Sequence, residues 1–152
     1  MMSNPSVTVS NGARAANLLE EACRQRPGTA NALQLEVVRV LALDIGRQLD
    51  ALAGLAREDV RPDVLVEAAL CCADLANLAA CNAPDLPPDA APRAVEAARL
   101  AAGTVEVLGP IIEAGSGDPG TEDLLRDVRS AAWRAGFAAR LVEGSSGKGG
   151  PD

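Results

Sequence analysis

The stretch from Val64 to Cys81 constrains the fold of this chain more than any other. It is the densest apolar run in the sequence, and it contains three of the four cysteines and one acid, Asp74. We predict that this stretch forms a helix at the centre of a bundle. Asp74 is then expected to be buried, and the other segments are expected to pack around this helix.

Aromatic residues are almost absent, which favours helices over sheets. Hydrophobic residues make up 48% of the chain, but aromatic residues only 1%, namely Trp133 and Phe137. The core must therefore be built from Ala, Leu and Val, whereas sheets are enriched in aromatic and β-branched residues. We predict an all-α fold, an antiparallel four-helix bundle with a short extra N-terminal helix. A disordered lead at 1–10, a single domain at 11–143 and a flexible tail at 144–152 complete the expected organisation.

Apolar spacing and breaker residues set the expected helix limits. A proline-rich loop is expected after Asn82, Gly109–Pro110 should kink or end the fourth helix, and residues 115–120 form a break. The second helix is predicted to place its larger side chains inward: Val38, Leu41, Ile45, Leu52 and Leu55. The predicted helices cover residues 13–26, 31–57, 62–82, the segment that begins with the cap at Asp89, and 121–142.

The charge and the missing histidine exclude several function classes. A net charge of −7 without a basic patch argues against nucleic-acid binding. Because the chain has no histidine, it lacks Ser-His and Cys-His nucleophile pairs and the commonest acid/base at neutral pH. We find no secretory signal pattern and no uninterrupted run of about 18 apolar residues. Four cysteines at irregular spacings indicate reduced thiols, so a cytoplasmic protein without a membrane span is expected.

Three charged residues are candidates for a catalytic or ligand-binding site. Asp74 lies among Leu, Ala and Cys, and such surroundings would raise its pKa and suit it to acid/base work. Asp44 and Arg47 are three residues apart on one helix and could add polarity to an apolar cavity. The alternative is that Asp74 pairs with an arginine, and that Asp44 and Arg47 form a surface ion pair. Whether the chain is an enzyme stays open.

The last predicted helix is apolar on two sides. Trp133, Phe137 and Leu141 lie opposite its main core stripe at about 100° per residue. Helices with two apolar faces are usually packed on both, and aromatic residues mixed with arginine are typical of protein interfaces. We predict a surface for self-association or a partner protein, with packing under the first helix as the alternative. The flanking arginines include Arg126, Arg129 and Arg140.

A short motif in the central helix resembles one known family. The residues are Cys72, Ala73, Asp74 and Leu75, followed by Leu78, Ala79 and Ala80. This pattern, with the helix order and loop placement over residues 31–110, resembles the cysteine-rich four-helix-bundle copper-binding (copper-storage) proteins. In that family cysteines recur every three or four residues and line the bundle interior, where they bind Cu(I).

The chain departs from this family at the positions that would hold copper. The comparable positions carry hydrocarbon side chains, and only Cys72 is carried over by the motif. The resemblance therefore implies a cysteine-depleted relative. The positions concerned are Val38, Leu41 and Ile45 in the second helix, and Val95, Ala98, Ala102 and Val105 in the fourth.

The remaining thiols are candidates for residual Cu(I) binding. Cys71 and Cys81 are about 15 Å apart along a helix, too far to share one ion whose ligands lie at about 2.3 Å. A site would need Cys23 to meet Cys71, Cys72 or Cys81 across helices, or the thiols to meet across a symmetric dimer. Otherwise each cysteine is a small apolar filler.

Three functions are compatible with these observations. The first is a non-catalytic, homo-oligomeric helical bundle that acts as a binding or accessory protein through its last helix. The second is residual Cu(I) binding through the four cysteines. The third is a small enzyme or ligand-binding bundle, with an apolar cavity around Asp74 and a small apolar ligand as its partner.

Overall fold

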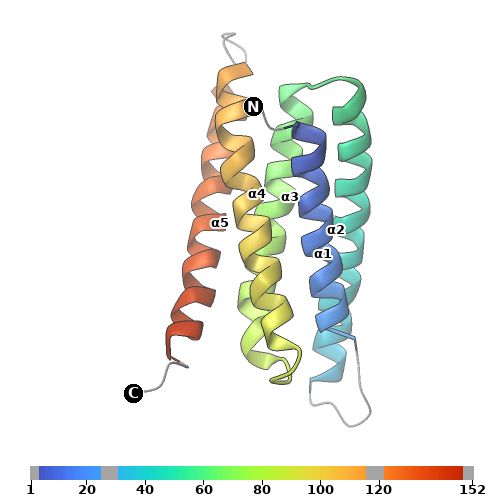
Figure 1. The fold of residues 1–152 in the computed structure, drawn as a ribbon, viewed down its shortest axis with the longest axis vertical. Coiled ribbons are helices and arrows are strands. Elements are labelled where there is room, and N and C mark those ends of the chain that lie inside the picture. Colours follow the sequence, from blue (N-terminus) through green and yellow to red (C-terminus); the bar gives the residue numbers. More distant parts are fainter. Residues whose placement is uncertain (1–3, 25–30, 116–121, 149–152) are drawn as a thin grey trace.

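The computed structural model describes residues 4–24, 31–115 and 122–148, and all regular structure in these ranges is helical. The helices lie side by side along the long axis, with α5 at one edge of the view and α2 at the other (Figure 1). The all-α prediction is confirmed. The elements are α1 (Pro5–Ala22), α2 (Ala32–Glu58), α3 (Pro62–Asn82), the short 3₁₀ helix η1 (Ala83–Asp85), α4 (Ala91–Gly115) and α5 (Glu122–Lys148).

The first helix begins earlier than predicted. The Asn4 side chain accepts a hydrogen bond of 3.0 Å from the Ser6 N–H, and Pro5 occupies the first turn, where its missing N–H is not needed. The Ser6 hydroxyl donates to the Ala53 carbonyl of α2 at 3.1 Å. The expected disordered lead at 1–10 is therefore wrong for residues 5–10, because a cap and a cross-helix hydrogen bond hold them in α1. Residues 25–26 of the predicted helix lie outside the described ranges.

α1 is a core helix and not a short extra one. It packs against α2 and α4, whereas α5 packs against α3 and α4. Small side chains such as Ala13 and Ala16 are buried along α1, and Gly12 lies against Cys72 of α3 and Leu49 of α2. The expectation of a short extra helix is wrong because the residues before Ala13 also belong to α1.

α2 packs inward through small residues as well as large ones. Ala42, Gly46, Ala53 and Ala56 are buried there, together with Leu35, Val38, Leu49 and Leu52. The prediction is confirmed for Val38 and Leu52, and Ile45 packs partly buried against the core. It is wrong for Leu41 and Leu55, which are exposed. Because α2 lies at an edge, only one side of it is covered, and small side chains let its neighbours approach closely.

α3 is the central helix, as expected. Most of its side chains are buried, and the segment Pro62–Asp85 has the length and mean hydropathy (1.7) of a membrane span, although 61% of its most apolar window is buried in the fold. A buried core helix in a soluble protein has the same composition. Cys72 faces the core, whereas the strip that contains Cys71 and Cys81 faces outward.

α4 and α5 both run further than the sequence predicts. α4 continues through Pro110 to Gly115, so Gly109–Pro110 does not end it. The α5 backbone is helical to Lys148, so residues 144–148 continue the helix, while 149–152 lie outside the described ranges. The flexibility of the tail stays a prediction. The core stripe of α5 is confirmed at Val128, Ala131, Ala135 and Val142, which are buried.

Candidate functional site

Both aromatic residues of the chain lie on the outer side of α5 and are exposed to solvent. Trp133 is 67% exposed, Phe137 44% and Leu141 42%. The two aromatic rings stack on each other with centroids 5.7 Å apart and an interplanar angle of 10°. Packing of these side chains under α1 is wrong, because α1 contacts α2, α3 and α4 and leaves them uncovered. We refer to Trp133, Phe137, Leu141, Arg126, Arg129 and Arg140 as the outer face of α5.

The arginines of α5 fall into two groups, those exposed at the outer face and Arg134, which pairs with α3. Arg126, Arg129 and Arg140 are exposed, and Arg126 pairs with Asp123 at 3.4 Å. Arg134 points to the other side of the helix, where its Nη2 contacts Asp74 Oδ1 of α3 at 2.8 Å. The Arg134 Nε is buried without a hydrogen-bond partner in the described part of the chain. Arg134 therefore links α5 to α3, whereas Arg126, Arg129 and Arg140 lie exposed at the outer face.

Asp74 does not lie in an apolar cavity. Its side chain is 60% exposed and holds the ion pair with Arg134. The expected burial of Asp74 is wrong because Asp74 lies on the side of α3 that faces Arg134 of α5 and solvent. The core side of α3 carries Cys72 and Leu75 instead. The alternative of pairing with an arginine is confirmed. Asp74 thus links two helices at the surface.

Asp44 and Arg47 also lie at the surface. Their side chains are 64% and 73% exposed, and the nearest charged atoms are 4.0 Å apart within α2. Such a pair contributes little to stability. Asp44 and Arg47 pair with each other within α2, whereas Asp74 of α3 pairs with Arg134 of α5. The three residues therefore do not form one site.

The four cysteines do not converge. Cys72 faces Gly12 of α1, Cys71 contacts Gln48 of α2 at 3.7 Å, and Cys81 contacts Asn77 one turn back at 3.7 Å. Cys23 is buried at the end of α1. Within the described ranges, no three metal-ligating residues of the His, Cys, Asp and Glu types lie close enough to hold an ion.

Burial raises the pKa of three of these thiols, Cys23, Cys71 and Cys72. It raises the pKa of Cys72 to about 12 and those of Cys23 and Cys71 to about 11, with nearby acids adding to the effect at Cys23 and Cys71. The thiolate is the form that binds metal, so each of these positions suits an apolar filler better than a ligand. Residual Cu(I) binding stays a prediction that an anaerobic titration would test.

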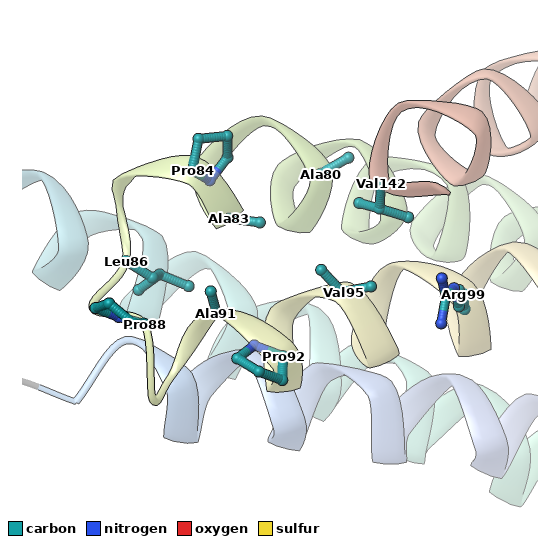
Figure 2. Close-up of a pocket in the computed structure, with 10 residues that line it drawn as sticks. All are labelled: Ala80, Ala83, Pro84, Leu86, Pro88, Ala91, Pro92, Val95, Arg99 and Val142. Atoms are coloured by element: carbon teal, nitrogen blue, oxygen red, sulfur yellow. The ribbon is translucent and has the colours of Figure 1, made fainter. Parts of the chain in front are cut away.

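Sequence reasoning missed a groove of about 670 Å³ at one end of the bundle. Figure 2 shows it between the end of α3 and the start of α4, with Leu86 and Pro88 at one end and Arg99 at the other. The sequence predicts the proline-rich loop only as a connection between two helices. The clue in the sequence is that Pro92, Val95 and Arg99 follow at helical spacing directly after that loop. The lining residues are Ala80, Ala83, Pro84, Leu86, Pro88, Ala91, Pro92, Val95, Arg99 and Val142.

Comparisons with known proteins do not add a relative. No model of a known protein family matches the chain, and no curated protein sequence matches it significantly. The resemblance to copper-storage proteins stays a prediction from the central motif.

Proposed function

We propose that this chain is a non-catalytic, cytoplasmic binding or accessory protein that self-associates through the outer face of α5. In this proposal α1 to α4 form an antiparallel four-helix bundle, and α5 is the added helix. Contacts of α1 with α2 and α4, and of α3 with α2 and α4, support a closed ring of four. Short connections such as the one between Glu58 and Pro62 favour antiparallel neighbours.

The observation that carries the proposal is the exposure of the stacked Trp133–Phe137 pair. The apolar patch would become buried if two copies met along α5. Burial of Trp133, Phe137 and Leu141 from both copies would stabilise an assembly by on the order of 10 kcal/mol. Association itself costs about 4–15 kcal/mol. We therefore expect a dimer of modest, concentration-dependent affinity.

The charges favour an antiparallel dimer with twofold symmetry. At 100° per residue, Glu122 and Asp123 share the outer face with Arg140, at the opposite end of the helix. In an antiparallel pairing the acids of one copy approach Arg140 of its partner. A parallel pairing would place like charges opposite one another, which is unfavourable.

Two findings support a binding role over catalysis. Asp74 and Asp44, the acids proposed for chemistry, are both held in exposed ion pairs. The chain also has no histidine to act as a base at neutral pH.

Sedimentation or light scattering of the purified chain tests the proposal. We expect a dimer at micromolar concentrations, and a monomer for the double variant Trp133→Ala with Phe137→Ala. The matched control is Leu33→Ala with Val37→Ala, which removes exposed apolar side chains from α2. A monomeric wild-type chain would contradict the proposal, and so would loss of the dimer in the α2 control alone.

A further inference from the structure

The groove at the end of the bundle has rigid, apolar walls. Its volume of about 670 Å³ falls within the range of about 300–1,000 Å³ that is typical of small-molecule sites. Three of the lining residues are prolines, Pro84, Pro88 and Pro92, whose backbone angles are restricted. Walls of this kind lose little conformational freedom when a ligand binds, and this favours affinity.

Arg99 gives the groove its only charge. It lies on α4 one turn after Val95, at the end of the groove that is opposite Leu86 and Pro88 (Figure 2). The other lining residues are alanine, proline, leucine and valine. Among residues 4–24, 31–115 and 122–148, the Arg99 side chain has no ion-pair or hydrogen-bond partner. Its guanidinium is therefore available to an external anion.

This distribution of charge selects one class of ligand. We propose that the groove binds a small amphiphile with an apolar tail and a single carboxylate, with the tail along Ala83, Leu86 and Val95 and the carboxylate at Arg99. A guanidinium receives a carboxylate through two parallel hydrogen bonds, which fixes the orientation of the ligand. The apolar tail supplies the larger part of the affinity through burial.

The acids near Arg99 lie outside this groove. Glu106 and Glu143 line a separate hollow of about 300 Å³ between α4 and α5, which also borders on Arg99. Neither acid lines the apolar groove. A ligand in the groove therefore meets the cation first, and a positively charged amphiphile is disfavoured there.

The proposal does not depend on self-association through α5. Of the residues in the groove, only Val142 belongs to α5, and it is buried on the core side of that helix. Binding in the groove can fail while the dimer forms, and the reverse also holds. The two proposals are therefore tested by separate measurements on the same protein.

Calorimetric titration with three probes of equal tail length tests the ligand class. The probes are octanoate, octanol and octyltrimethylammonium, each added to the full chain. We expect octanoate to bind most tightly, octanol more weakly and the cation most weakly. In Arg99→Gln the affinity for octanoate should fall about tenfold or more, while the affinity for octanol should stay unchanged.

The control is Arg93→Gln, which removes an exposed arginine from the same helix outside the groove lining. It should bind octanoate as the wild type does. Val95→Phe, which fills the groove, should weaken octanoate and octanol alike. The proposal is overturned if octanoate does not bind the wild type, if Arg99→Gln binds it within twofold of the wild type, if Arg93→Gln loses as much, or if the cation binds most tightly.

Discussion

At the residue scale, the close approach of α1 to α3 and α2 at Gly12 depends on a missing side chain. A Cβ added at Gly12 of α1 would lie 2.5 Å from Cys72 Sγ of α3 and 3.3 Å from Leu49 of α2. The same Cys72 is the residue that the copper-storage motif would assign to metal. In this chain its sulfur fills the space that Gly12 leaves open.

Gly12→Ala is therefore expected to destabilise the fold. Alanine normally gains about 1 kcal/mol over glycine within a helix, but overpacking costs about 1–3 kcal/mol, and we expect the clash with Cys72 to win. In the control Gly54→Ala nothing lies within 4 Å of the added Cβ, so that variant should gain stability. Chemical unfolding measures both variants. Adding Cys72→Ala to Gly12→Ala should recover part of the loss, and a stabilised Gly12→Ala would contradict the packing.

At the scale of elements, a group of charges joins the first two helices. Glu20 of α1 is largely buried and pairs with Arg24 at 2.9 Å and with Arg39 of α2 at 3.2 Å. Arg39 also pairs with Glu36 on its own helix at 2.6 Å. The hydrogen bond from Arg24, followed by that from Arg39, lowers the pKa of Glu20 below its usual 4.5, although burial opposes the shift.

The contribution of Glu20 to stability should depend on pH. A carboxyl group whose pKa is lowered by folding stabilises the protein above its unfolded pKa, and this contribution is lost as the pH falls through the folded pKa. We expect Glu20→Gln to cost about 1–2 kcal/mol at pH 7, with a difference from wild type that shrinks below pH 4.5. Unfolding curves at several pH values measure it against Glu21→Gln, an exposed neighbour. A difference that is constant with pH would contradict the pairing.

Some of the helices and their buried positions could be predicted from the sequence, and others could not. Alanine and leucine periodicity was sufficient for an all-α fold and for α3 as its centre. It was not sufficient to place α1, because residues 5–10 are Pro, Ser, Val and Thr, which have poor helix propensity and are held by a cap and tertiary contacts. Leu41 and Leu55 were wrongly placed inside because a large apolar residue seems the better core candidate, whereas Ala42 and Ala56 permit closer packing.

Of the two candidate sites, one could be predicted from the sequence and the other could not. The outer face of α5 could be predicted because its residues repeat on one helix. The groove could not, since its walls come from α3, η1, the loop, α4 and α5, and no local pattern links Ala80 with Val142. Whether Asp74 is buried or exposed depends on which side of α3 faces the core. In a helix that is apolar almost all round, periodicity does not decide this.

At the scale of the whole molecule, the outer face of α5 and the groove lie on different parts of the fold. The outer face exposes the side chains of Trp133, Phe137 and Leu141, and the groove is a hollow of about 670 Å³ at the end of the bundle. Exposed apolar patches of this kind mark interaction sites in soluble proteins. We therefore propose a small scaffold with one surface for a copy of itself and one groove for a ligand.

The fluorescence of Trp133 reports directly on self-association through the outer face of α5, because Trp133 is the only tryptophan in the chain. Its quenching by acrylamide should be strong in dilute protein, where the indole is 67% exposed, and should fall as the concentration rises, in step with the formation of dimer. A dimer in which Trp133 stays as accessible to acrylamide as in the monomer would contradict the account, because the interface would then lie elsewhere.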